Sequence, residues 1–380
     1  MKKIALVFPI LLIFAFIGCE KDLDFITNKN GVSNLSSELQ EIYKMMPTRN
    51  YNHISTVGGE ILHFSSFADY ENAYQQLHSD CNMWDSLFYT TYGQTLSEDS
   101  LVIWEESIGY DEFYPVTLFE IALGVNGSML YDQQRIVKQN WINRNFNSPD
   151  PTENLFIDEI EQAFYTIRKE ICIADTIYQF RDNALILIPA NKYSYWCEIR
   201  DFSLDSLSKE DVTIEIDNKE YICSENLSEH IHFRATTDIT LTPENTAFLD
   251  SKEMIKIKIV GRRGLFHQAV VISKMENYKQ INNKYKKVRR NCSITTDQTF
   301  FYERFHILNS NCIEYDTEPS INELPEIKNK KTYTTNVFTN FMFLDFHPLK
   351  FRRYGVLSDG LNLKYQYENN GEIEMEFDLN

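Results

Sequence analysis

The chain has 380 residues, of which 43% are apolar and 24% charged, and these proportions exclude wholesale disorder and a coiled coil. Its 37 basic and 55 acidic residues give a net charge of −18, which argues against a nucleic-acid-binding protein. Aromatic residues make up 14% of the chain and only 13 residues are glycine, a composition that favours packed sheet. The length indicates two or three domains.

The N-terminus has the pattern of an export signal. Lys2 and Lys3 precede an apolar run over residues 4–17, which is shorter than the ~20 residues of a membrane-spanning helix. Gly18 followed by Cys19 resembles the lipobox of bacterial lipoproteins, in which the signal is cut before the cysteine and acyl chains such as palmitate are attached to it. Two or three acyl chains on one residue would anchor the mature protein to a membrane. The alternative is an ordinary secretory peptide in which Cys19 is incidental.

The residues after Cys19 indicate a destination. Residues 20–24, Glu-Lys-Asp-Leu-Asp, resemble the lysine-then-acid signal that sends lipoproteins of the Bacteroidetes to the outer face of the outer membrane, although Leu23 interrupts the usual acidic pair. The polar stretch 28–37 is typical of a flexible spacer. We therefore expect a signal peptide over 1–18 and an acylated Cys19 with a flexible tether over 19–45, in a surface-exposed lipoprotein of the outer membrane.

Cysteine use fits an exported protein without fixing a disulfide pattern. Six cysteines besides Cys19 allow 15 pairings. The candidate bridge joins Cys292 to Cys312, and the alternative is a set of buried thiols. The chain has no CxxC motif, so neither a zinc knuckle nor a thioredoxin-type site is predicted. The six are Cys81, Cys172, Cys197, Cys223, Cys292 and Cys312.

Residues 38–165 show mainly helical periodicity. Ser66 is a candidate helix cap, and apolar residues then recur at helical spacing at positions 67, 70, 74 and 77. Residues 170–190 change character and read as strands, with a turn at 181–183. We expect a helix-rich mixed domain over 46–200.

From about residue 211 the apolar period is two, as in strands. The last 20 residues predict a hairpin, in which a three-residue loop at 369–371 pairs Tyr367 with Ile373 and Tyr365 with Met375 and places Gly371 in a left-handed bulge. Acidic residues on the other face of this hairpin indicate an antiparallel sheet that is wet on one side. We expect residues 201–380 to form an all-β, sandwich-like domain, and the fold class to be α+β.

Several segments resemble a family of Bacteroidales surface lipoproteins of unknown function. The matching pieces are residues 60–77, 104–110 and 170–180, with Tyr278-Lys279 and Lys286-Lys287 in a basic β segment. Ala174 stands where the family has glycine in its "I-G-D-x-I-Y-x-F" strand pair. The resemblance implies a strand-plus-helix opening followed by this strand pair, and it supplies no catalytic residues and no cofactor.

Motifs of catalysis are absent from the sequence, which contains no GxSxG, HExxH, P-loop or GxGxxG. His230 and His232 would project from one face of a strand, either as a metal-binding pair or as ordinary polar residues. Glu105 and Glu106 beside Trp104 diverge on any regular element, so they cannot act as a glycosidase pair. We expect a core tryptophan with solvated acids there.

Residues 262–290 carry nine basic side chains against one acid. One hypothesis is a docking site for a polyanion such as a phosphorylated glycan. The alternative is that these cations neutralise acidic groups of the protein itself or lie on exposed strand edges. The nine residues are Arg262, Arg263, Lys274, Lys279, Lys284, Lys286, Lys287, Arg289 and Arg290.

Three serines lie in Asp-Ser-Leu sequences that resemble the O-glycosylation acceptor of exported Bacteroidetes proteins. They are Ser86, Ser100 and Ser206, and Thr176 in Asp-Thr-Ile is a weaker match because it lies in an expected strand.

These patterns favour a non-catalytic protein that binds a glycan or another surface ligand, with membrane attachment through its lipid, no cofactor and no nucleic-acid partner. The alternatives are a polysaccharide-acting hydrolase with a site between the domains and a structural subunit of a surface assembly.

Overall fold

The computed structural model describes residues 35–144, 151–152, 155–181, 184–210, 212–216, 236–241, 253–263, 269–295, 300–308, 311–320, 328–340, 350–356, 360–367 and 371–378. The signal peptide, Cys19, His230 and His232 lie outside these ranges. The α+β class is confirmed, with helices in the N-terminal part and antiparallel sheets in the C-terminal part.

Helices dominate up to about residue 162. Ser66 caps the longest of them as predicted, because its side-chain oxygen accepts a hydrogen bond from the backbone N–H of Asp69 at 3.1 Å. The first helix begins within the expected tether and buries Leu39 and Ile42 against the next one. The helices are α1 (Ser37–Met45), α2 (Phe67–Phe88), which continues as a π-helical turn over Tyr89–Gly93, α3 (Glu98–Ile108), α4 (Tyr114–Leu123), α5 (Leu130–Asn143) and α6 (Glu159–Gln162).

A six-stranded sheet packs beside these helices. Its order is β1-β2-β3-β4-β5-β6, and among these described strands the β2–β3 pair is parallel while the other pairs are antiparallel. The strands expected over 170–190 are confirmed as the central ones, and β6 joins this sheet from beyond residue 200. The elements are β1 (Ser55–Val57), β2 (Ile61–Phe64), β3 (Glu170–Ile173), β4 (Thr176–Arg181), β5 (Ala184–Pro189) and β6 (Thr213–Ile216), with α7 (Tyr193–Ile199) and α8 (Leu204–Leu207) before β6.

Three antiparallel sheets form the rest of the described chain. The first sheet has the strand order β10-β9-β8-β7, and β15 also pairs with β9. The second sheet has the order β14-β11-β17-β18, and the third has the order β13-β12-β16. The strands are β7 (Thr236–Leu241), β8 (Glu253–Arg263), β9 (Ala269–Ile281), β10 (Lys284–Lys287), β11 (Arg290–Thr295), β12 (Phe300–Leu308), β13 (Asn311–Ser320), β14 (Lys328–Lys330), β15 (Thr332–Asn340), β16 (Lys350–Val356), β17 (Gly360–Tyr367) and β18 (Gly371–Asp378).

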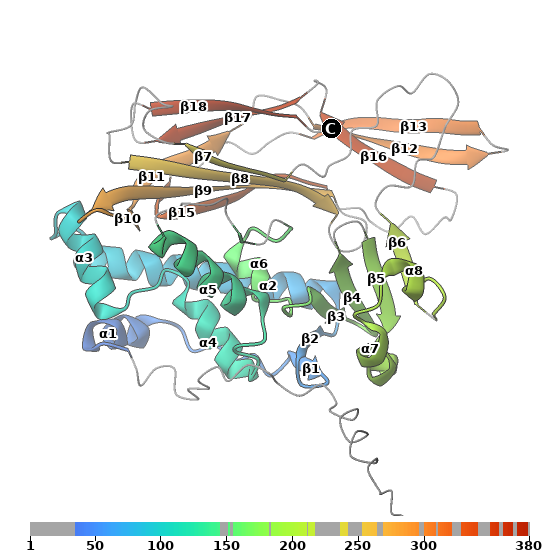
Figure 1. The fold of residues 1–380 in the computed structure, drawn as a ribbon, viewed down its shortest axis with the longest axis horizontal. Helices are drawn as coiled ribbons and strands as arrows, with labels where there is room; N and C mark the ends of the chain where they lie inside the picture. The colour runs from blue at the N-terminus through green and yellow to red at the C-terminus, as the bar shows by residue number, and fades with distance from the viewer. Residues whose placement is uncertain are drawn as a thin grey trace, which may run out of the picture.

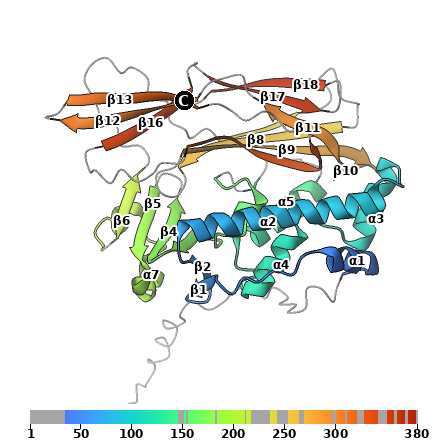
Figure 2. The same ribbon diagram turned by 180° about the vertical axis from the view of Figure 1, so that it is seen from behind.

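These elements stack in layers. The β8–β9 sheet lies over the helices, and the sheet of β17 and β18 lies on its far side (Figure 1). The view from behind shows α2 running beneath the same sheet (Figure 2). One face of the β8–β9 sheet therefore packs on another sheet and the opposite face packs on helices.

The C-terminal hairpin is confirmed, but its predicted register is wrong by two residues. Tyr365 pairs with Ile373 instead of Met375, and Tyr367 pairs with Gly371, which begins β18 instead of occupying the turn. A shift of two residues leaves each side chain on its original face, so the apolar pattern used for the prediction is equally satisfied by both registers.

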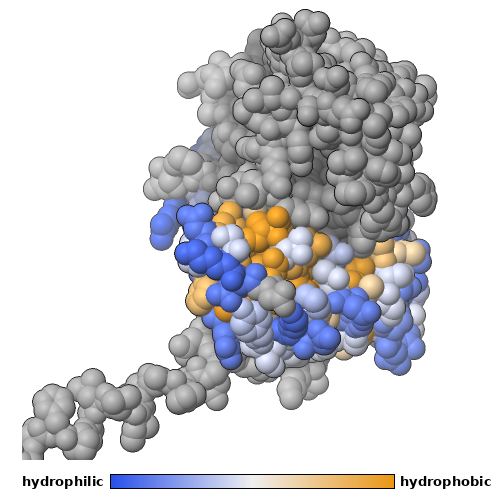
Figure 3. All heavy atoms as spheres, turned by 90° about the vertical axis from the view of Figure 1, so that its right-hand side faces the viewer, coloured by the Kyte–Doolittle hydropathy of each residue, from blue (hydrophilic) through white to orange (hydrophobic). Residues whose placement is uncertain are grey.

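The largest apolar core lies between the helices and the six-stranded sheet. Phe64, Phe119 and Phe164 are fully buried there, and the ring centroid of Phe164 lies 5.7 Å from that of Phe64 and 5.2 Å from that of Phe119. Trp196 of α7 anchors a second core on the other face of that sheet. Seen from the side of α7 and α8, apolar side chains gather in a patch bordered by hydrophilic ones (Figure 3).

The candidate disulfide between Cys292 and Cys312 is not formed, because Cys292 carries a buried thiol. Cys81, Cys172 and Cys197 are likewise thiols. Within the described ranges, no helix combines the length and apolarity needed to cross a bilayer.

Candidate functional site

The face of the β8–β9 sheet that meets the helices is charged. Strand alternation sends Ile255 and Ile257 of β8 to the sheet-facing side and the lysines beside them to the helices. Lys256 lies over the ring of Trp141 in α5 at 4.9 Å, and Lys258 donates a hydrogen bond to Thr152 at 2.7 Å. Both lysines are at most 4% exposed. Buried charged groups require partners, so the lysines on this face need acidic or other polar groups between the sheet and the helices.

Glu276 of β9 is the centre of the first ionic cluster. Its carboxylate pairs with Lys138 of α5, with Lys287 at 3.1 Å and with Lys274 at 3.8 Å. Lys274 also pairs with Glu159 at the start of α6. Although burial alone would raise the pKa of Glu276, these three ammonium groups hold it well below its usual range.

Lysines outnumber carboxylates in this cluster. Burial and the neighbouring lysines lower the pKa of Lys138 to about 7, against the attraction of Glu276. Burial, with the charge of Lys138, lowers the pKa of Lys256 to about 4, so Lys256 is neutral at neutral pH. The cluster comprises Lys138, Lys256, Lys258, Lys274 and Lys287 against Glu112, Glu159 and Glu276.

Asp85 of α2 is the centre of a second cluster. Its carboxylate accepts hydrogen bonds from Arg289 at 3.0 Å, from Lys330 at 2.7 Å and from the hydroxyl of Tyr110 at 2.7 Å. Asp85 is 4% exposed, and Arg289 also lies over the ring of Tyr89. Although burial alone would raise the pKa of Asp85, the two cations lower it far below the ordinary value.

Helix α3 supplies further acids to the sheets. Glu98 pairs with Arg290 and, at 2.9 Å, with Lys279. Arg290 also reaches Glu253 of β8 at 2.5 Å. Helices α3, α5 and α6 pair with strands β9 and β11, and α2 pairs with Arg289 beside β11 and with Lys330 of β14, so ion pairs make up much of the contact between the helices and the β region.

Most of the basic segment therefore has partners inside the protein. Acids pair with Lys274, Lys279, Lys286, Lys287, Arg289 and Arg290. This arrangement favours the alternative that these cations neutralise the protein's own acidic groups. In the described part of the chain Lys284 makes no ion pair, and the side chains of Arg262 and Arg263 lie outside the description. The dipeptides Tyr278-Lys279 and Lys286-Lys287, which carry part of the resemblance to the lipoprotein family, lie opposite each other in the β9–β10 hairpin. Tyr278 pairs with Lys287, and Lys279 pairs with Lys286.

The expectation of solvated acids beside Trp104 is half wrong. Glu106 is exposed and pairs with Lys286. Glu105 is 2% exposed and pairs with Lys331, because its face of α3 is turned to the sheets. Trp104 is half-buried and packs on Phe88 and Tyr92 at the edge of the core, so the expected core tryptophan is only partly enclosed.

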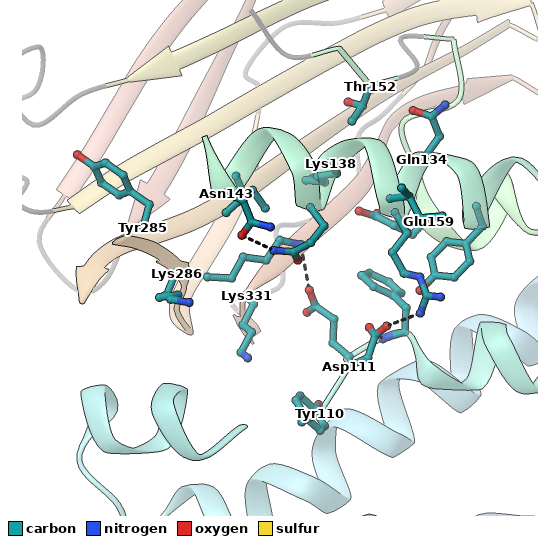
Figure 4. A pocket seen from close by; sticks show the side chains of 18 of the residues that line it. Tyr110, Asp111, Gln134, Lys138, Asn143, Thr152, Glu159, Tyr285, Lys286 and Lys331 are labelled. Carbon is teal, nitrogen blue, oxygen red and sulfur yellow. Dashed lines mark hydrogen bonds and ion pairs between the residues drawn. The ribbon is translucent and has the colours of Figure 1, made fainter. Parts of the chain in front are cut away.

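A cavity of about 510 Å³ opens between α5 and the β9–β10 hairpin. Figure 4 shows Lys138 and Asn143 projecting from α5, Tyr285 and Lys286 lying on β10, and Tyr110 at the opposite wall. Its charged lining comprises Arg135, Lys138, Lys258, Lys274, Lys284, Lys286, Lys287 and Lys331 against Glu105, Glu106, Asp111, Glu112 and Glu159. Pockets of 300–1,000 Å³ are the usual size for small-ligand sites.

Sequence reasoning singled out the cations of β9 and β10 but missed Lys138, Lys331 and Glu276 as members of a site. The alternation of lysine with isoleucine in β8 was visible, and such a face is ordinarily solvated. Only the helices that cover it turn it into a cavity wall.

The three serines of the Asp-Ser-Leu sequences are exposed. Ser86 lies within α2, Ser100 in the first turn of α3 and Ser206 in α8, whereas Thr176 is half-buried at the start of β4. The hydroxyls of Ser100 and Ser206 contact those of Ser97 and Ser203. Asp85, which precedes Ser86, is buried, so that sequence is only partly accessible.

Known proteins offer little comparison. No family model matches the chain, and no curated protein matches it. Among solved structures, the chain is similar to a DUF4848 family protein from Bacteroides thetaiotaomicron, with 8% identity and a TM-score of 0.15 over 85% of this chain and 100% of that one. No group of three or more potential metal-binding side chains occurs among the described residues.

Proposed function

We propose that the protein is a surface-exposed outer-membrane lipoprotein, anchored through acylated Cys19, that binds a glycan or another surface ligand without catalysis. The observation that carries the binding role is the cavity between α5 and the β9–β10 hairpin. Its volume of about 510 Å³ falls within the range of small-ligand sites.

The walls of the cavity are fixed before any ligand arrives. Lys138, Lys274 and Glu159 belong to buried ion pairs, which hold α5 and α6 at a set distance from β9. A preformed site loses less conformational entropy on binding than one that must be ordered. The polar amides of Gln134, Gln139 and Asn143 on α5 add hydrogen-bonding groups along one wall.

Blocking the cavity tests the binding role. Gln139 lines it and is exposed, so Gln139→Trp would fill space without removing a buried contact. We expect ligands found by screening a glycan array and a small-molecule library against residues 20–380 to bind Gln139→Trp at least tenfold more weakly.

Gln133→Trp is the matched control, because Gln133 is exposed on the same helix and does not line the cavity. Equal binding by both variants, or no ligand from either screen, would contradict the proposed role.

The anchor is tested by the mass of the mature N-terminus. We expect membrane-extracted protein to begin at Cys19 with acyl chains attached, and Cys19→Ala to abolish both the acyl mass and membrane retention. Protein that carries no acyl mass and is released into the medium would refute the anchor. Protease treatment of intact cells then distinguishes an outward-facing protein from one that faces the periplasm.

A further inference from the structure

Three lysines at the cavity lie in front of their carboxylate partners. In three of its ion pairs the lysine is the more exposed partner: the side chain of Lys138 is 14% exposed against 2% for Glu276, that of Lys287 is 22% against 10% for Glu112, and that of Lys331 is 10% against 2% for Glu105. At these three pairs the carboxylates lie behind the ammonium groups, so a molecule that contacts Lys138, Lys287 or Lys331 meets positive charge first. At two other pairs of the lining the acid is the more exposed partner, with Glu159 at 11% against 6% for Lys274 and Glu106 at 53% against 25% for Lys286.

The charge balance of the lining points the same way. Eight basic and five acidic residues line the cavity of a protein whose net charge is −18. Lys258 and Lys274 lie directly opposite each other in the β8–β9 register, and like charges in that position repel. A bound anion would relieve this repulsion, whereas a neutral ligand would leave it in place.

We propose that the ligand of this cavity carries a carboxylate, sulfate or phosphate group that pairs with the ammonium groups of Lys138, Lys287 and Lys331. This inference rests on the proposed binding function and narrows it to anionic ligands. An acidic sugar and a free inorganic anion share the required chemistry.

Anion binding should be linked to protonation of Lys138. Because the pKa of Lys138 in the empty protein is about 7, a nearby anion would raise it and draw a proton from solution. Affinity should then fall as the pH rises, by about tenfold between pH 6 and pH 8. The charged groups that face Lys138 are Lys274 and Glu276 of β9, Lys287 of β10 and Glu159 of α6, and the titratable but neutral amine of Lys256 of β8 lies beside it.

The experiment is calorimetric titration of residues 20–380 with glucuronate, glucose and inorganic sulfate at pH 6 and pH 8. Glucuronate and sulfate keep their charge across this range, so any pH dependence belongs to the protein. We expect glucuronate to bind at least tenfold more tightly than glucose and more tightly at pH 6. Tighter binding of glucuronate than of sulfate would identify an acidic sugar, and the reverse order would identify a free anion.

Two substitutions separate charge from fold. Lys138→Met should weaken glucuronate binding at least tenfold, while Lys138→Arg should retain binding and lose its pH dependence, because a guanidinium does not titrate there. Lys44→Met, at an exposed pair on α1, is the control and should change neither.

The outcomes are distinguishable from those of the proposed function. If neutral ligands bind as tightly as anions, and Gln139→Trp loses the binding of both kinds of ligand, the inference of an anionic ligand is overturned while the proposed binding role stands. No binding of either anion at either pH would overturn this inference by itself.

Discussion

At the scale of single residues, the turn between β3 and β4 carries a strained position. Ala174 has φ = 51°, a left-handed conformation that glycine adopts without strain and that costs an L-residue about 1–2 kcal/mol. Hydrogen bonds hold the turn on both sides. The N–H of Ala174 donates to the carbonyl of Phe64 at 2.8 Å, and the carbonyl of Ala174 accepts from Nε2 of His63 at 2.8 Å. Ala174 therefore occupies a backbone conformation that suits glycine, the residue that the resembling lipoproteins have at this place.

Ala174→Gly should stabilise the protein. Relief of the strain exceeds the added entropy of the unfolded chain, so we expect the free energy of unfolding to rise by up to about 1 kcal/mol. Denaturant unfolding of residues 20–380 measures it.

Ala122→Gly is the matched control, because Ala122 is exposed within α4 and glycine should destabilise it by roughly 0.5–1 kcal/mol. Equal destabilisation by both substitutions would show that the turn at Ala174 is not strained.

At the scale of elements, alternation correctly assigned strands but not their pairing. The hairpin of β17 and β18 has the predicted apolar face, with Leu363 opposite Met375 and Leu361 opposite Phe377. The face of a strand repeats every two residues, so a slip by two keeps that face intact. The register had to be decided by the structure.

Cysteine pairs distinguish the two registers. Lys364 lies opposite Glu374 in the structure, whereas the sequence-based register places Gln366 there. We expect Lys364→Cys with Glu374→Cys to form a disulfide under mild oxidation, detectable by peptide mass spectrometry, because only directly opposed residues bring Cβ atoms within about 5.5 Å. Preferential cross-linking of Gln366→Cys with Glu374→Cys would restore the predicted register.

At the scale of the whole molecule, the helices and the β region are joined by buried ion pairs rather than by one continuous apolar core. The clusters around Asp85 and Glu276 each join helix residues to strand residues more than 130 positions away, Asp85 to Lys330 of β14 and Lys138 to Glu276 of β9. Removing one member of a buried pair leaves the other charge uncompensated, which is costly. The two parts should therefore unfold together.

Asp85→Asn tests this coupling. It would leave the buried guanidinium of Arg289 without its carboxylate, and we expect a loss of about 3–5 kcal/mol in the free energy of unfolding at pH 7. Asp99→Asn, at an exposed pair with Lys279, is the control and should cost no more than about 1 kcal/mol.

The same substitution has a defined pH dependence. The pKa of Asp85 is lower in the folded protein than its ordinary value of about 3.9, so its stabilisation is complete above that value and is lost as the pH falls below it. The stability difference between the natural protein and Asp85→Asn should therefore shrink below about pH 4. A difference that stays constant from pH 7 to pH 3 would mean that the carboxylate contributes no net charge interaction.

Local sequence patterns were enough to predict the α+β class, the cap at Ser66, the strands over 170–190 and the apolar faces of the C-terminal hairpin. Each depends on spacing or hydrogen bonding within a single element, so the residues that decide it are neighbours in the chain. The tertiary structure alone decided the hairpin register, the left-handed turn at Ala174 and the cavity. Lys274 and Glu159 are 115 residues apart, and Arg289 and Asp85 are 204 apart. Whether a lysine on a strand is solvated or buried against a carboxylate depends on which distant element covers it, and no local pattern records that choice.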